Sequence, residues 1–200
     1  MMILVAIGSL FVGALCGHFL FSPAAVALMD TVMSYALMLL LLSVGVEVGS
    51  NKTVFRTIRT YHVRILVIPL GVAAGSIAGG MLLGLGLGIP LNEAAAVSSG
   101  FGFYSVSAVI LRELGGSQLG TVAFLTNILR ELLSFLVIPV VAKYLGSHAA
   151  IAPSGATAMD TTLPAIAKAT NQETALMAVI SGVVLTALVP VLVPVAYNLL

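Results

Sequence analysis

Apolar runs of about 20 residues follow one another along almost the whole chain, with short polar breaks between them. About 20 helical residues are needed to cross a hydrocarbon core about 30 Å thick. That length predicts transmembrane helices at 2–20, 31–49, 65–88, 92–111, 119–142 and 174–199. A further segment, 149–168, is more polar, and it either spans the membrane or re-enters it. The expected fold is therefore an all-α polytopic membrane protein of about six to seven transmembrane helices.

The composition supports a membrane protein and excludes an ordinary soluble domain. Charged residues make up 8% of the chain and hydrophobic residues 60%, whereas soluble domains carry roughly 25% charged residues. No polar stretch is long enough for a soluble domain, so residues 1–200 are expected to form a single integral membrane transporter domain. A net charge of +1 gives no reason to expect a nucleic-acid partner. The single cysteine, Cys16, indicates neither a disulfide nor a metal site, and no cofactor is expected.

The connection between the second and third predicted helices indicates the orientation. Its sequence NKTVFRTIRTYHVR contains Lys52, Arg56, Arg59 and Arg64 and no acidic residue. Basic loops stay preferentially on the cytoplasmic side of the membrane. The loop and the N-terminus are therefore expected to be cytoplasmic, in a multi-pass protein of the cytoplasmic membrane. A binding role for the loop is an alternative, although topology alone explains its charge.

Two segments depart from the pattern of a simple helix. The first interrupted segment, Val97 to Val109, reads VSSGFGFYSVSAV, and the second interrupted segment, Ala152 to Pro164, reads APSGATAMDTTLP. Irregular backbone at membrane depth is tolerated only where it is buried in protein or lines a cavity. Paired interrupted helices indicate a substrate site in many transporters. The two segments are therefore expected to face each other at one site.

A polar cluster interrupts the apolar run from Gln118 to Val141. Its members, in the string LTNILREL, are Asn127, Arg130 and Glu131. A charged side chain at the centre of a membrane helix costs roughly 2.5 to 3.5 kcal/mol on insertion scales. Such residues commonly face a protein interior or a water-filled path for a substrate or ion. The cluster therefore favours a transporter over a passive membrane anchor.

Helix geometry separates the members of this cluster. Asn127 and Glu131 are four residues apart, so they project from the same helix face. Arg130 lies about 100° around the helix from Glu131, so the two charges cannot satisfy each other well. Each is expected to find a partner on another span, in water or on a ligand. The structural alternative is that Arg130 pairs with an acid such as Asp160 and fixes helix packing.

The second interrupted segment supplies further candidates. Asp160 precedes Thr161-Thr162-Leu163-Pro164, so it either caps a half-helix that starts near Thr161 or contacts the ligand. The two roles are compatible, because the ends of half-helices can themselves bind ions and carboxylates. Thr157 is expected near the substrate for the same reason.

The remaining candidates lie on other spans. Glu47 ends the second apolar run, and it either reaches the cytoplasmic interface or serves as an entry-side carboxylate for a cation. The hydroxyl groups of Tyr104 and Ser105 are expected to hydrogen-bond to the substrate, or else to bond only to the preceding helical turn. An intramembrane enzyme is not expected, because the sequence lacks HExxH and GxSxG signatures.

Three strings, in this order, resemble landmark segments of the lysine exporter family LysO. They are SGFGFYSVSAVIL, FLTNILRELLSFLVIP and SGATAMDTTLPAI, and the likeness extends from about Leu37 to the C-terminus. The resemblance implies export of L-lysine, and of analogues such as thialysine, with Glu131 as the acid that matters for transport. Longer members carry an additional N-terminal membrane portion. The resemblance therefore implies a homo-oligomer or a second small membrane subunit as partner.

Lysine carries a net charge of +1, so its export works against an inside-negative membrane potential. Exchange for an incoming proton would cancel that charge. Burial disfavours the ionised form of a carboxylate and a nearby cation favours it, so Glu131 suits this exchange. Arg130, or the backbone N–H groups near Ser154 to Thr157, would receive the substrate carboxylate. The alternatives are a cation antiporter, in which Glu131 and Asp160 bind Na⁺, and an accessory subunit of a split transporter.

Overall fold

The structure is a computed structural model, and it describes residues 66–199 together with single residues between positions 12 and 50. The chain divides into two compact units, Met1–Leu39 and Leu40–Leu200, and all helices discussed below belong to the second. Most of the first predicted helix, part of the second, the basic loop and Glu47 lie outside the described residues. The predicted orientation therefore stays a prediction.

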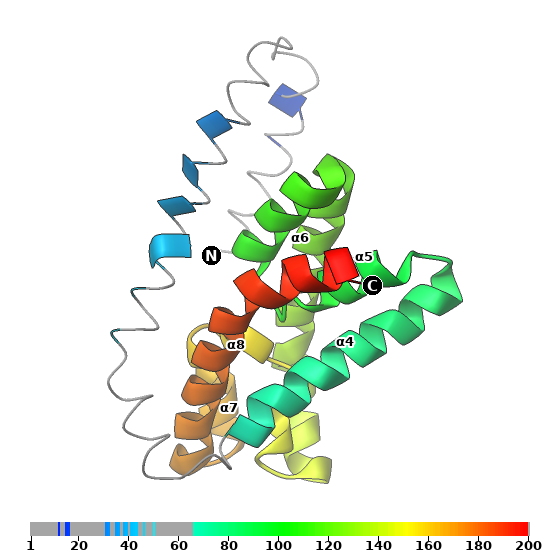
Figure 1. The fold of residues 1–200 in the computed structure, drawn as a ribbon. Helices are drawn as coiled ribbons and strands as arrows, with labels where there is room; N and C mark the ends of the chain where they lie inside the picture. Colours follow the sequence, from blue (N-terminus) through cyan, green and yellow to red (C-terminus); the bar gives the residue numbers. More distant parts are fainter. Residues whose placement is uncertain are drawn as a thin grey trace. The chain divides into compact units, whose positions relative to one another are not determined.

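The continuously described part is built from helices, and it contains no strand (Figure 1). Three helices are long and apolar enough to cross a membrane, namely α4 (Val67–Leu87), α6 (Tyr104–Leu145) and α8 (Gln172–Leu199). The shorter elements are α5 (Leu91–Ser98), η2 (Ala149–Ile151), η3 (Gly155–Met159) and α7 (Leu163–Ala169). This architecture confirms the predicted class of an all-α membrane protein.

Helices α4 and α5 pack closely because glycine lines their contact. A Cβ atom on Gly84 would lie 2.5 Å from the Cβ of Ala94, and one on Gly80 would overlap the side chain of Ser98. The left-handed backbone of Gly88, with φ of 70°, ends α4 and donates its N–H to the carbonyl of Gly84. Small residues four apart allow such close helix contact. The other glycines at this spacing, where a Cβ atom would meet nothing within 4 Å, are Gly71, Gly75 and Gly79.

Helix α6 is bent back on itself at Gly116, whose backbone is not helical (φ 87°, ψ 175°). The two arms pack tightly, since a Cβ atom on Gly120 would lie 2.8 Å from the carbonyl oxygen of Ala108. The second arm corresponds to the predicted helix 119–142. The predicted helix 92–111 is instead α5 followed by a break and the first arm of α6.

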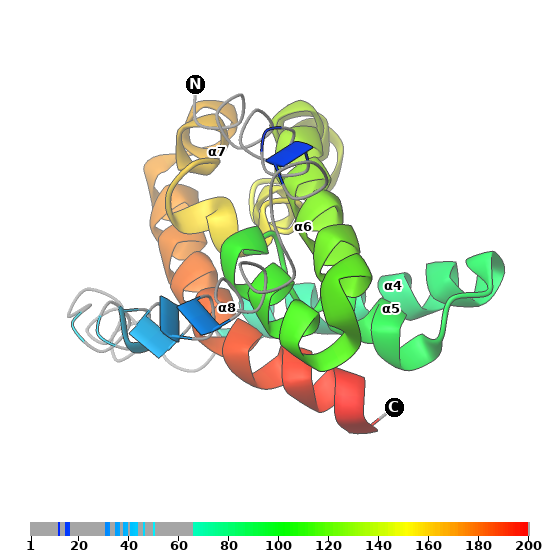
Figure 2. The ribbon, with the colours of Figure 1, turned by 90° about the horizontal axis from the view of Figure 1, so that it is seen from above.

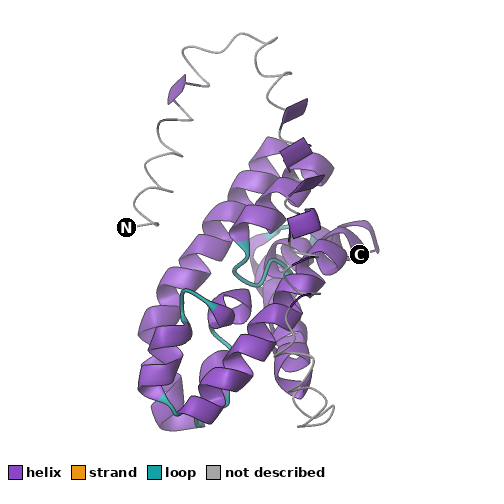
Figure 3. Cartoon of the chain, turned by 90° about the vertical axis from the view of Figure 1, so that its left-hand side faces the viewer, coloured by secondary structure: helices purple, strands orange, loops and turns teal. Residues whose placement is uncertain are grey.

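Both interrupted segments are present as breaks in the helices. In the first, residues 99–103 are not helical, and Phe101 and Gly102 have positive φ values of 48° and 91°. The second contains η3 and the beginning of α7. At about 1.5 Å per residue, the seven residues of α7 extend only about 10 Å, so no helix within 149–168 is long enough to cross a membrane. In Figure 3 the loops and turns, in teal, lie among the helices.

The second interrupted segment forms part of the core rather than a surface loop. In the view from above it lies between α6 and α8 (Figure 2). A buried apolar cluster draws on α6, the 3₁₀ helices, α7 and α8, and consists of Ile138, Ala150, Ile151, Ala158, Ile166 and Ala178. Burial of this cluster fixes the irregular segment against two long helices.

Candidate functional site

Asn127, on the second arm of α6, holds the break of the first interrupted segment. Its Oδ1 accepts the backbone N–H of Gly102 at 2.7 Å, and its Nδ2 donates to the carbonyl of Val97 at 3.3 Å. Nδ2 also lies 2.9 Å from the carbonyl of Ala123 and 3.4 Å from the hydroxyl of Ser107. Asn127 is 2% exposed, so its amide replaces helical hydrogen bonds that the break removes.

Arg130 holds the second interrupted segment in a similar way. Its Nε donates to the carbonyl of Pro153 at 3.2 Å, and its two terminal nitrogens donate to the carbonyl of Ala152 at 3.2 Å and to the hydroxyl of Ser76 at 2.9 Å. These partners are neutral, so the expected alternative of an ion pair with Asp160 is not what positions the guanidinium. Ser134 adds a hydrogen bond to the carbonyl of Pro153 at 2.8 Å. Arg130 therefore connects α6, α4 and the second interrupted segment.

The two interrupted segments are in direct contact. The N–H of Ala156 donates to the carbonyl of Phe101 at 2.8 Å. Gly155 has a φ of 61°, and a Cβ atom there would overlap the Phe101 carbonyl oxygen. A Cβ atom on Gly102 would lie 3.4 Å from the carbonyl oxygen of Ser154. The expected juxtaposition of the segments is thus observed, as backbone against backbone.

Glu131 has different partners from its two polar neighbours. It is 4% exposed, and the side chain of Thr161 hydrogen-bonds to its carboxylate. Asp160 is close enough for its charge to act on Glu131, and Tyr104 is close enough to interact with both carboxylates. Among the described residues, no basic side chain forms an ion pair with Glu131. The buried carboxylate of Glu131, on α6, therefore interacts with the exposed carboxylate of Asp160, in the second interrupted segment.

Asp160 does not act as the expected helix cap. Helix α7 begins at Leu163, and the residue at its N-cap position is Thr162. The Asp160 side chain instead accepts the N–H of its own neighbour, Thr161. The prediction of an N-cap was wrong because two further residues form a turn before the helix starts. The other role considered for Asp160, ligand contact, stays a prediction.

The remaining described candidates are Tyr104 and Ser105 at the start of α6 and Thr157 in the second interrupted segment. Tyr104 is the first residue of α6, and its ring packs edge-on against Phe124 with centroids 5.5 Å apart. Ser105 follows it in the first turn of α6. Thr157 is 8% exposed, and its hydroxyl donates to the carbonyl of Ser154 at 2.8 Å. The hydrogen bonds of Thr157 thus lie within the second segment.

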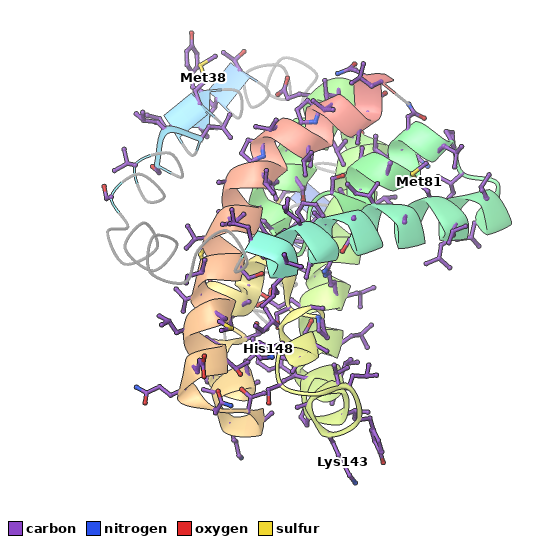
Figure 4. All side chains as sticks on the ribbon, turned by 60° about the horizontal axis from the view of Figure 1, so that its bottom comes forward. Met38, Met81, Lys143 and His148 are labelled. Carbon is purple, nitrogen blue, oxygen red and sulfur yellow. The ribbon has the colours of Figure 1, made fainter. Side chains whose placement is uncertain are left out.

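Sequence reasoning missed two residues that support Arg130. Ser76 comes from α4, far away in sequence, and nothing in its surroundings indicates this partner. Ser134 lies four residues after Arg130, so its position on the same helix face could have suggested it. The other described basic groups include Lys143, which is exposed and projects from the C-terminal end of α6 (Figure 4).

The chemistry available to this site is the binding of a cation. Glu131 and Asp160 are close enough for their charges to interact, and like charges repel unless protons or cations neutralise them. The described residues contain no group of three or more His, Cys, Asp or Glu side chains that could hold a metal ion. An organic cation with hydrogen-bond donors would match two carboxylates flanked by the hydroxyls of Thr161 and Tyr104.

Comparison with known proteins supports the resemblance in the sequence. The family model described as lysine exporter LysO matches residues 7–197. The chain is 34% identical over 159 residues to "Lysine exporter LysO" of Escherichia coli (strain K12), covering 80% of this chain and 52% of that protein. It is also 34% identical over 158 residues to "Putative lysine exporter" of Haemophilus influenzae, covering 79% of this chain and 80% of that protein. The chain thus spans about half the length of the Escherichia coli relative, and no solved structure matches.

Proposed function

Because this chain belongs to the lysine exporter LysO family, we propose that it exports L-lysine across the cytoplasmic membrane. Analogues that keep both ammonium groups, such as thialysine, would follow the same route. The observation that carries the proposal is the pair formed by buried Glu131 and exposed Asp160, with no basic partner for Glu131 among the described residues. A bound ammonium group would neutralise the charge that the described residues leave uncompensated there.

The charges near the broken helices complement those of lysine. Lysine carries two ammonium groups, and Glu131 and Asp160 supply two carboxylates. The donors of Arg130 already bind neutral oxygens of Ser76 and the second segment. We therefore assign Arg130 to supporting the site rather than to binding the substrate carboxylate.

The N-terminus of α6 is a better place for the substrate carboxylate. The helix begins at Tyr104 inside the first interrupted segment, and no side chain caps it. The first N–H groups of a helix have no intrahelical partner, and they lie at the positive end of the helix dipole. By contrast, the N–H groups of Ser154 and Ala156 donate to the carbonyls of Ile151 and Phe101. Tyr104, the first residue of α6, is also close enough to both acids for their charges to act on it.

Proton exchange would make export favourable. Moving one positive charge out against the membrane potential costs about 2.3 kcal/mol per 100 mV. In our proposal, ionised Glu131 binds an ammonium group of lysine from the cytoplasmic side. A proton from outside then neutralises the carboxylate and releases the substrate, so that one charge leaves as one enters.

The pair of acids also favours one competing function, a Na⁺/H⁺-type antiporter in which Glu131 and Asp160 bind Na⁺. Thermal unfolding of the purified protein distinguishes the two. For the exporter we expect L-lysine to raise the unfolding temperature in a saturable way, with no such effect from Na⁺ at equal ionic strength. Stabilisation by Na⁺ and none by lysine would reject lysine export in favour of the antiporter.

The state of assembly is also part of the proposal. We propose a homo-oligomer or a complex with a second small membrane subunit, and an accessory subunit of a split transporter is the alternative. Lysine release from vesicles that contain only this protein, with the oligomeric mass measured in detergent, tests these possibilities. Release without a partner supports the homo-oligomer, and release only with a co-purified membrane protein supports the complex. A partner that releases lysine without this chain would identify the chain as accessory.

A further inference from the structure

The two carboxylates of the site differ in how deeply they are buried. Glu131 is 4% exposed, whereas Asp160 belongs to the exposed residues of the second interrupted segment. Thr161 lies between them: its side chain hydrogen-bonds to Glu131, and its hydroxyl lies 3.4 Å from Oδ1 of Asp160. The site therefore has a buried acidic end and an exposed acidic end, both in contact with the side chain of Thr161.

The carboxylate of Asp160 is available to a ligand. The described structure gives it hydrogen bonds only from its neighbour Thr161, and α7 starts too far along the chain to need it as a cap. Its local backbone is fixed, because the N–H of Asp160 donates to the carbonyl of Thr157 at 3.2 Å and its own carbonyl accepts the N–H of Leu163 at 3.3 Å. A carboxylate on such a held turn can orient a bound cation.

Lysine has the same asymmetry as the site. Its α-carbon carries an ammonium and a carboxylate, which are strongly hydrated, and its apolar stem ends in one isolated ammonium. Long cationic side chains can bury their apolar stem along apolar surface, and the cost of desolvation rises with the number of charges removed from water. The single charge at the end of the stem therefore costs less to desolvate than the doubly charged head. Only the stem can deliver a charge to a buried carboxylate without burying the head.

Resting on the proposed export of lysine, we infer that the two acids divide its two ammonium groups. Glu131 binds the ε-ammonium at the buried end, and Asp160 binds the α-ammonium at the exposed end. This arrangement places the substrate carboxylate near the start of α6, beside Tyr104. It makes Asp160 the residue that recognises an α-amino group and Glu131 the residue that recognises a terminal amine.

Two lysine analogues separate these roles. L-2-aminohexanoate lacks the ε-ammonium, and 6-aminohexanoate lacks the α-ammonium. The experiment measures how each displaces radiolabelled L-lysine from the full-length purified protein, with the variants Glu131→Gln and Asp160→Asn compared with wild type. Both variants keep side-chain shape, and unfolding without ligand checks that each is folded. Where a variant binds lysine too weakly for displacement, the binding of radiolabelled lysine or of a radiolabelled analogue is measured directly at higher protein concentration.

We expect each analogue to bind the wild-type protein at least tenfold more weakly than lysine, because one carboxylate then lacks its partner. Glu131→Gln should weaken lysine at least tenfold and leave 2-aminohexanoate within twofold. Asp160→Asn should weaken lysine at least tenfold and leave 6-aminohexanoate within twofold.

Three results would overturn the division of the ammonium groups. These are the reverse assignment, equal weakening of both analogues by each variant, and no binding of either analogue to wild type at a thousandfold excess over the lysine concentration. Failure of lysine itself to bind the wild-type protein would instead reject the proposed function, and the inference with it. The two failures are therefore distinguishable.

Discussion

The N–H of Ala156 donates a hydrogen bond of 2.8 Å to the carbonyl of Phe101, and this contact joins the two interrupted segments. Each segment is also held by a different polar residue of α6, the first by Asn127 and the second by Arg130. Glu131, next in sequence to Arg130, is left facing Asp160 and Thr161. The irregular backbone is thus fixed by the same helix that carries the proposed binding carboxylate.

Gly155→Ala should destabilise the protein. The left-handed backbone at this position, with φ of 61°, costs an alanine about 1 to 2 kcal/mol, and the new Cβ would also overlap the Phe101 carbonyl oxygen. Thermal unfolding in detergent measures the effect. Gly79→Ala is the matched control, since a Cβ there meets nothing within 4 Å and should stabilise α4 by up to about 1 kcal/mol. Equal unfolding temperatures for the two variants would contradict the close contact.

Asn127→Ala should lower stability by about 1 to 3 kcal/mol, because it leaves the Gly102 N–H and the Val97 carbonyl without their partner in a buried site. The same unfolding assay applies. Thr121→Ala on the same arm is the control, since its exposed hydroxyl bonds only to the carbonyl of Ser117 in its own helix. Our account of Asn127 fails if its variant is no less stable than the control.

Arg130→Lys should reduce stability by about 2 kcal/mol or more although it keeps the positive charge. One ammonium cannot reproduce the planar set of donors that reaches Ser76, Ala152 and Pro153. Hydrogen bonds from charged donors contribute about 1.5 to 3 kcal/mol each. The reverse exchange, Lys143→Arg, is a suitable control at an exposed helix end and should change little. A fully stable Arg130→Lys protein would show that charge alone matters.

The breaks in the helices could be predicted from sequence because glycine, proline and hydroxyl residues at membrane depth do not fit a continuous helix. The position of Asn127 and Glu131 on one helix face also followed from their spacing. The partners of Arg130 could not be predicted, since two of them are backbone carbonyls whose direction depends on the fold. The N-cap at Asp160 was wrong for a related reason, because the length of the turn before α7 is set by packing in the core.

An imposed pH gradient should change the rate of transport. Acid outside lysine-loaded vesicles should accelerate efflux. A proton from outside neutralises the carboxylate of Glu131, which releases the substrate and supplies the exchanged charge. Efflux is followed with radiolabelled lysine at a clamped membrane potential. Lysine that leaves at the same rate with and without the gradient would remove proton exchange from the mechanism while sparing lysine binding.

The central claim is that Glu131 is the carboxylate that binds and releases lysine, and efflux from lysine-loaded proteoliposomes tests it most directly. Glu131→Gln removes the charge and keeps the shape, and Glu173→Gln, at an exposed position in the first turn of α8, is the matched control. We expect the control to export lysine at the wild-type rate. Glu131→Gln should export at least tenfold more slowly and should not respond to external acid. Wild-type rates in Glu131→Gln would contradict the account.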